Sequence, residues 1–163
     1  MSSPEALVAG LVGRGLTVAC AESLTGGLVC AALTSVAGSS RTVRGGVVSY
    51  ATDVKAAVLG VDAERLRETG PVDALVAEQM ALGVARVLGA DVGLATTGVA
   101  GPGPADGMPA GTVFVAACGP WPGGVTSRRL ALPGDRAQVR AATVDAVIDL
   151  LGEQLAVLAP QGE

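Results

Sequence analysis

The stretch LTVACAESLTGGLVC, residues 16 to 30, decides the fold class. LTVACAE (16–22) is typical of a buried strand, and SLTGG then supplies turn residues before an apolar helix that we expect to end near Gly38. A strand that leads through a glycine turn into a helix is the repeating unit of an α/β sheet. Because such sheets bind ligands where their strands end, Ser23 and Thr25 occupy a position where a site is expected.

The rest of the chain continues this alternation of helices and strands. The last two strands should form a hairpin with 125–132 at the sheet edge, which makes the sheet mixed. We predict one domain, residues 1–163, with Ser3 capping the first helix, Thr52 or Asp53 the third and Asp135 the last. Besides the helix after residue 23, helices are predicted at 2–16, 53–61, 62–70, 72–90 and 134–159, and strands at 16–22, 45–51, 91–98, 112–118 and 125–132.

Composition excludes several classes of protein. The chain has no histidine, so no Ser-His-Asp triad can form and the commonest metal ligand is missing. A net charge of −4 without a basic tract argues against nucleic-acid binding. Three scattered cysteines predict reduced thiols in a cytoplasmic protein. The N-terminus lacks the basic region of a secretory signal, and prolines and glycines interrupt the uncharged run 107–127, so we expect no membrane span. The mean hydropathy of +0.53 favours a homo-oligomer.

The stretch GGVVSYATDVK, residues 45 to 55, holds the only tyrosine and the only lysine, whereas the other ten basic residues are arginine. Lys55 could act as a general base only when neutral, so its pKa would have to fall by about three units from about 10.4. Arginine could not replace it, because arginine stays protonated. The alternative is a surface lysine kept by chance. Tyr50 is either a half-buried strand aromatic or a phenol that bonds a neighbouring amine or hydroxyl.

Three further stretches carry candidate residues. The Gly26–Gly27 turn could hold an anion or a developing oxyanion with its N–H groups, unless Ser23 is simply a helix cap. TTGVAGPGPADGMPAG (96–111) is either a loop whose backbone approaches a ligand or an ordinary surface loop. Arg136 and Arg140 lie one turn apart on a predicted helix, where they either bind an anionic ligand or form a solvated face.

Four motifs together resemble, in order and spacing, the C-terminal domain of the CinA (competence/damage-inducible) proteins, the nicotinamide-nucleotide amidase family. They are AESLTGG (21–27), GSSRTVRGGVVSYATDVKAAVLGV (38–61), TGVAGPGPADGMPAGTVFVA (97–116) and LPGDRAQVR (132–140). The resemblance covers about residues 4–155. It implies a three-layer α/β/α sandwich with a mixed, mostly parallel sheet, in a stand-alone form without a molybdopterin-binding-like N-terminal domain. It also implies hydrolysis of the carboxamide of nicotinamide mononucleotide to nicotinate mononucleotide and ammonia, with no metal and no cofactor.

The resemblance also implies roles for individual residues. Ser23 would be the nucleophile, with Thr25 as the next candidate, Lys55 the base and Tyr50 its assistant. Gly45 and Gly46, or the Gly26–Gly27 turn, would supply oxyanion donors, and Arg136 and Arg140 would hold the 5′-phosphate. The full set expected to line the substrate site is Glu22, Thr25, Gly26, Gly27, Gly45, Gly46, Thr97, Gly98, Gly101, Arg136 and Arg140.

Two positions depart from the family pattern. Asp73 stands where the family usually has a serine, and Val43 stands where a bulky aromatic is common. Two alternatives to this function stay open. One is a non-catalytic nucleotide-binding or regulatory protein of the same fold, and the other is an amidase with a different substrate.

Overall fold

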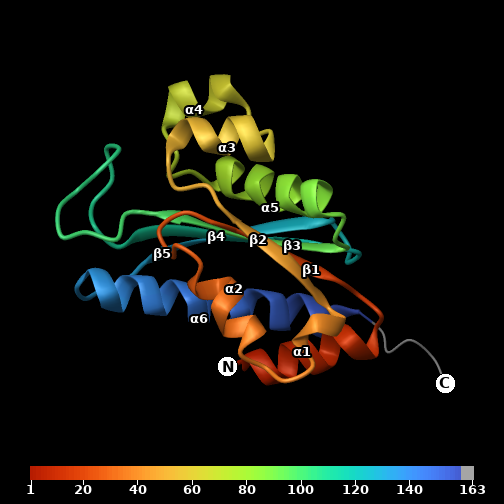
Figure 1. Cartoon of the computed structure of the whole chain (residues 1–163). Helices are drawn as coiled ribbons and strands as arrows, with labels where there is room; N and C mark the ends of the chain where they lie inside the picture. Colours follow the sequence, from red (N-terminus) through yellow and green to blue (C-terminus); the bar gives the residue numbers. More distant parts are fainter. Residues whose placement is uncertain (159–163) are drawn as a thin grey trace.

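A five-stranded sheet forms the centre of the computed structural model, which describes residues 1–158 (Figure 1). The strand order is β2-β1-β3-β4-β5, with β1 parallel to both β2 and β3, and β4 antiparallel to both β3 and β5. Four strands therefore run in one direction and β4 opposes them, which confirms the mixed sheet and the edge position of β5. The strands are β1 (Val18–Glu22), β2 (Val43–Val48), β3 (Val92–Gly98), β4 (Thr112–Cys118) and β5 (Val125–Ala131).

Helices cover both faces of this sheet, as predicted. On one face lie α1 (Pro4–Gly13), α2 (Leu28–Thr34) and α6 (Arg136–Val157). On the other lies α5 (Ala74–Leu88), with α3 (Thr52–Leu59) and α4 (Ala63–Thr69) packed outside it (Figure 1). Successive residues of β1 divide between two apolar cores, with Val18 and Cys20 toward α6 and Ala19 and Ala21 toward α5.

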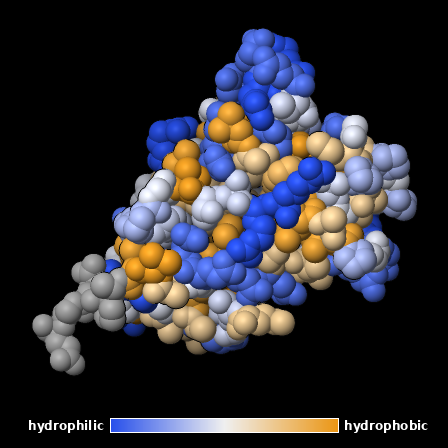
Figure 2. Space-filling view, turned by 180° about the vertical axis from the view of Figure 1, so that it is seen from behind, coloured by the Kyte–Doolittle hydropathy of each residue, from blue (hydrophilic) through white to orange (hydrophobic). Residues whose placement is uncertain are grey.

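The surface carries both kinds of side chain. Viewed from behind, apolar and hydrophilic residues are interspersed over the body, while the end formed by α4 is hydrophilic (Figure 2). Within residues 1–158, no helix combines the length and the apolar character needed to cross a membrane.

Most predicted elements are present with shifted ends. The apolar helix stops at Thr34 instead of near Gly38, with Ser35 as its C-cap. Helix α3 begins one residue early, with Ala51 as its N-cap, so the caps predicted at Thr52 or Asp53 were wrong. The side chain of Asp135 does cap α6, as predicted. The predicted end of this helix at residue 159 and the domain segment 159–163 lie outside the described residues.

Two glycines let α3, α5 and the sheet approach to backbone contact. A Cβ added at Gly93 in β3 would lie far inside the contact distance of the Ala81 carbonyl oxygen in α5. A Cβ added at Gly83 in α5 would meet the Leu59 carbonyl oxygen in α3 in the same way. Since backbone atoms cannot move aside as a flexible side chain can, both positions exclude any larger residue.

We expect Gly83→Ala to lower the free energy of unfolding by about 2 kcal/mol, because overpacking outweighs the helix propensity that alanine adds. Urea unfolding followed by circular dichroism measures this change. Gly13→Ala makes the same substitution in a helix where nothing lies within 4 Å of the added carbon. That control should change stability by less than about 0.5 kcal/mol. Equal stability of the two variants would contradict the close packing.

Candidate active site

Ser23 directly follows β1, on a turn that glycines make possible. Its N–H donates to the Thr96 carbonyl of β3 at 3.0 Å, and its own carbonyl accepts from the N–H of Gly26 at 3.1 Å. Gly26 and Gly27 have φ values of 56° and 107°, a left-handed conformation that favours glycine. The N-cap of α2 is Gly27, so Ser23 is not a helix cap and its hydroxyl is free for another role.

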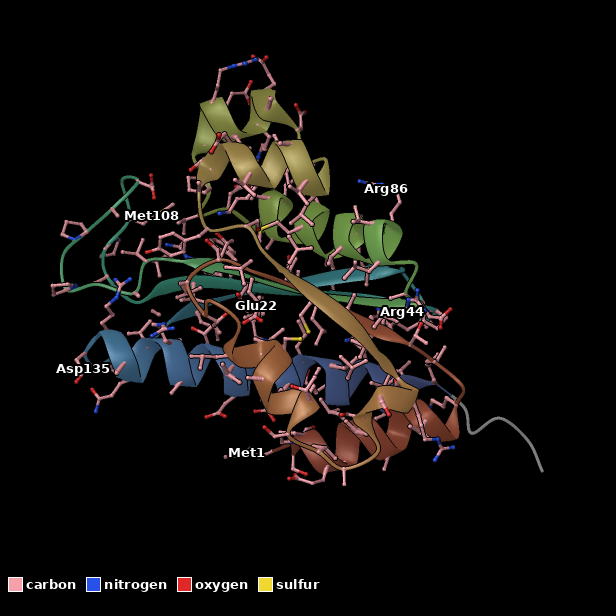
Figure 3. All side chains as sticks on the ribbon, in the orientation of Figure 1. Met1, Glu22, Arg44, Arg86, Met108 and Asp135 are labelled. Carbon is pink, nitrogen blue, oxygen red and sulfur yellow. The ribbon has the colours of Figure 1, made fainter. Side chains whose placement is uncertain are left out.

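Glu22 holds this turn from beneath instead of lining the substrate site. Its carboxylate accepts from the N–H groups of Val29 at 2.8 Å and Cys30 at 3.1 Å, in the first turn of α2. Glu22 thus supplies the capping oxygens that Gly27 lacks, and its charge suits the positive end of the helix. In Figure 3 it lies between the sheet and α2. Glu22, predicted among the substrate-binding residues, thus lies outside the cavity lining, where its contacts position the turn.

Thr25 belongs to the same buried network. Its hydroxyl donates to Glu22 Oε1 at 2.6 Å and lies 2.8 Å from the hydroxyl of Thr96. Because an ionised carboxylate only accepts, the Thr25 proton points to Glu22, and Thr96 must donate to Thr25. Thr25 is fully buried and does not line the cavity described below. This geometry favours Ser23 over Thr25 as the nucleophile.

Lys55 reaches Ser23 from α3 on the other side of the sheet end. Its Nζ lies 2.9 Å from Ser23 Oγ, 2.7 Å from the Ser49 carbonyl and 3.2 Å from the Tyr50 carbonyl. As an ammonium, Lys55 donates one N–H to each of these oxygens. As a neutral amine, it keeps two N–H groups for the carbonyls and directs its lone pair at the Ser23 hydroxyl. Both protonation states are therefore satisfied without rearrangement.

The environment of Lys55 favours the neutral amine. The side chain is fully buried, and this burial lowers the pKa of Lys55 to about 8, while the negative charge of Asp106 acts in the opposite direction. About a tenth of the lysine is then neutral at pH 7, against less than a thousandth for a free lysine. A buried amine of this pKa beside a serine hydroxyl has the arrangement of a base and its nucleophile.

A cavity of about 310 Å³ opens above this pair. Ser23 and Lys55 line it together with Thr97, whose hydroxyl donates to the Pro71 carbonyl at 2.7 Å. The remaining lining residues are Leu24, Tyr50, Thr52, Pro71, Val72, Arg136 and the stretch 98–106 at the end of β3 and in the following loop, including the predicted residues Gly98 and Gly101. The volume of this cavity falls within the range of small-molecule binding sites.

The two arginines predicted to act together have separate places. Arg136 lines the cavity, where it donates to the Gly101 carbonyl at 2.7 Å and to the Tyr50 hydroxyl at 3.2 Å. Arg140 instead donates to the Leu24 carbonyl at 2.9 Å and to the Thr25 carbonyl at 3.4 Å, so it braces the turn from outside the cavity.

The role predicted for Tyr50 also changes. This residue follows β2 instead of belonging to it, and its phenol is exposed and bonds Arg136, neither the amine nor the serine. Only its main-chain carbonyl contacts Lys55.

Four predicted glycines do not line the cavity. Gly45 and Gly46 pair with β1 inside the sheet, and Gly46 precedes Ser49 by three extended residues, about 10 Å. The structure therefore does not bring Gly45 and Gly46 together with Ser23 and Lys55. Gly26 and Gly27 shape the turn but also lie outside the lining.

The departures from the family pattern also lie away from the cavity. Asp73 caps α5 and pairs with Arg65, with 2.8 Å between Arg65 Nη2 and Asp73 Oδ1. Val43 begins β2 and packs against the core on the α6 side.

Sequence reasoning missed two residues of the site. Asp106 lines the cavity, and its signal was the Asp-Gly pair within the loop, which is typical of a tight turn. Thr96 had no signal beyond its place at the end of a strand, because its role depends on contacts with Ser23 and Thr25.

Comparisons with known proteins agree with this architecture. The profile of the CinA C-terminal domain matches residues 2–155. A "CinA-like protein" of Frankia casuarinae is 49% identical over 157 residues, covering 96% of this chain and 36% of the relative. Another, of Gloeobacter violaceus, is 42% identical over 146 residues, covering 89% and 34%. The chain thus spans about a third of the length of the curated relatives it matches.

Solved structures are similar over nearly their whole length. A competence-damaged protein (CinA) superfamily protein from Klebsiella pneumoniae has a TM-score of 0.88 and 36% identity, covering 94% of this chain and 95% of that one. A competence/damage inducible protein from Agrobacterium tumefaciens has a TM-score of 0.83 and 36% identity, covering 93% and 94%.

Proposed function

The chain belongs to the CinA C-terminal domain family, and on this premise we propose that it hydrolyses the carboxamide of nicotinamide mononucleotide. The observation that carries the proposal is the 2.9 Å contact between Lys55 Nζ and Ser23 Oγ, buried at the base of a cavity. A hydroxyl paired with a depressed-pKa amine suits acyl transfer and gives a non-catalytic binding protein no advantage.

In the proposed reaction, neutral Lys55 takes the proton of Ser23 as Oγ bonds to the amide carbon. The resulting ammonium then gives this proton to the amide nitrogen, the C–N bond breaks and ammonia leaves. Water attacks the acyl-serine ester and passes a proton through Lys55 to Ser23 Oγ as the ester bond breaks. Nicotinate mononucleotide and the starting enzyme result, so one lysine serves as base and acid in each half of the cycle.

The backbone N–H groups of Leu24 and Thr25 are our proposed oxyanion donors. They follow the nucleophile on the turn, and within residues 1–158 neither has a hydrogen-bond acceptor. Leu24 also lines the cavity. Donors fixed by a rigid turn stabilise a developing oxyanion without having to reorganise.

The proposed base predicts the pH dependence of the reaction. Because only neutral Lys55 is active, we expect kcat/KM to rise about tenfold per pH unit below pH 8 and to level off above it. Initial rates between about pH 6.5 and about pH 9.5 give this profile. Since Lys55 is the only lysine, lysine-selective ¹³C labelling gives one side-chain NMR signal, which should titrate near the same pH. A flat rate profile, or a signal that titrates near pH 10.4, would rule out this base.

Ammonia release from nicotinamide mononucleotide tests the function itself, and binding without turnover would favour the non-catalytic alternative.

We expect Arg136→Met to raise KM for the nucleotide by about tenfold, because a charge-assisted contact to the 5′-phosphate is lost. The same variant should leave KM for nicotinamide riboside, which has no phosphate, nearly unchanged. Arg41→Met is the matched control, since Arg41 is exposed and lies outside the cavity. Equal losses with nucleotide and riboside would refute the phosphate role.

A further inference from the structure

Asp106 stands at the tip of a tight hairpin in the loop after β3. Ala105 and Met108 exchange two backbone hydrogen bonds, of 3.1 and 2.9 Å. The two residues between them, Asp106 and Gly107, have positive φ values of 52° and 74°. This is the backbone of a two-residue primed turn, for which Asp-Gly is a preferred pair. Met108 marks the hairpin in Figure 3.

The hairpin tip lines the cavity and lies close to the segment that joins α4 to α5. A Cβ built on Gly70, between α4 and α5, would come within 3.6 Å of Asp106 Cβ. Asp106 lines the cavity with Lys55 and Arg136, and it is the one acidic side chain among the lining residues. Within residues 1–158, its carboxylate has no hydrogen bond or salt bridge to a protein group. An exposed negative charge at the hairpin tip thus lines the cavity without a protein partner among the described residues.

The substrate class of the proposed function carries a matching positive charge. In an oxidised nicotinamide nucleotide the ring nitrogen is cationic, and a single ring carbon separates it from the carbon that bears the carboxamide. When the carboxamide reaches Ser23, the ring cation must therefore lie deep in the cavity near Lys55. The phosphate would meet Arg136, which leaves Asp106 as the only acidic partner that the lining offers to the ring.

We propose that Asp106 is the counter-ion of the pyridinium ring and makes the site prefer the oxidised nucleotide, whose ring is cationic, to the reduced nucleotide, whose ring is neutral. This inference rests on the proposed function, because it assumes that the carboxamide docks at Ser23. The Coulombic effect of Asp106 on the pKa of Lys55 supports it, since that effect places the carboxylate within electrostatic range of the reacting group.

A binding experiment in a Ser23→Ala background tests the preference without turnover. Calorimetry would compare nicotinamide mononucleotide with its 1,4-dihydro form, before and after Asp106→Asn. Asparagine removes the charge and tolerates the left-handed conformation, so the turn is kept. We expect Asp106→Asn to weaken binding of the oxidised nucleotide about fivefold and to leave that of the reduced form unchanged. Asp53→Asn makes the same charge change on α3 outside the cavity and should alter neither.

Equal weakening of both forms would overturn the proposal, because it would mean that Asp106 binds the ribose or only shapes the loop. No weakening of either form would overturn it as well. Failure of the proposed function has a separate signature, namely wild-type protein that releases no ammonia from the oxidised nucleotide. Turnover by the wild type without a charge-dependent change in Asp106→Asn would reject this inference alone.

Discussion

Ser23→Ala is expected to lower kcat for nicotinamide mononucleotide by about 10⁴-fold or more, the largest effect of any single substitution in the chain. Ser23 Oγ forms the covalent bond of the proposed intermediate, and within the cavity lining no other hydroxyl lies against the Lys55 amine. Thr25 cannot easily replace Ser23 as the nucleophile, because its hydroxyl donates a hydrogen bond to Glu22 and is buried outside the cavity. Ammonia release under saturating substrate measures the loss.

The control for this variant is Ser35→Ala, the same substitution at an exposed position on the end of α2. It should keep the wild-type kcat, and both variants should unfold at nearly the wild-type temperature. Rapid-quench mass spectrometry of the wild type should also find a nicotinoyl-nucleotide ester on the peptide that carries Ser23. If Ser23→Ala retained more than a tenth of the wild-type kcat, Ser23 could not be the nucleophile, and Thr25→Ala would become the variant to measure.

Replacing Lys55 should have the second largest effect, a loss of about 10³-fold in kcat/KM. Lys55→Arg keeps a positive charge that does not titrate near neutral pH, so it removes the base while preserving the charge. Lys55→Met keeps a linear side chain of similar size and removes both the charge and the base. We expect both variants to be inactive, and we expect the rise of kcat/KM with pH to vanish from any residual activity.

These two variants also separate chemistry from folding. Arginine is larger than lysine at a fully buried site, so Lys55→Arg could lose activity through misfolding alone. Lys55→Met has no such excess volume, and its thermal unfolding and nucleotide affinity show whether the cavity is intact. Full activity in either variant would contradict the role of Lys55 as base. Inactivity of both, with folding and binding preserved in Lys55→Met, is the result that supports it.

The sequence was most informative where local pattern determines local structure. The strand, glycine turn and helix around Ser23 predicted its position at the end of β1, since strand and turn chemistry are local properties. The solitary Lys55 was singled out because an arginine-rich chain keeps a lysine where an amine must titrate. The contact between Lys55 and Ser23 could not be derived from the local sequence pattern, because it depends on how α3 packs against the ends of two strands.

Side-chain direction could not be predicted in the same way. Glu22 and Ser23 are neighbours at a strand end, yet the carboxylate turns into the protein beneath α2 and the hydroxyl turns toward the cavity. Gly45 and Gly46 lie within β2, where they pair with β1, so they are away from the strand ends that the cavity adjoins. Arg136 and Arg140 share a helix, but one turn of helix is enough to place them on different sides of the Ser23 turn.

Because helices and sheet are closely packed at Gly83 and Gly93, the cavity walls fall into two classes. One class cannot accept insertions or larger side chains, and the other can. Ser23, Lys55 and Thr97 belong to a frame whose layers already touch through their backbones, so insertions there would force the layers apart. Residues 102–110 of the loop after β3 form a mostly exposed surface connection, and such connections tolerate changes of length and sequence. New substrate preferences should therefore be obtainable by exchanging this loop as a cassette while the reacting pair stays untouched.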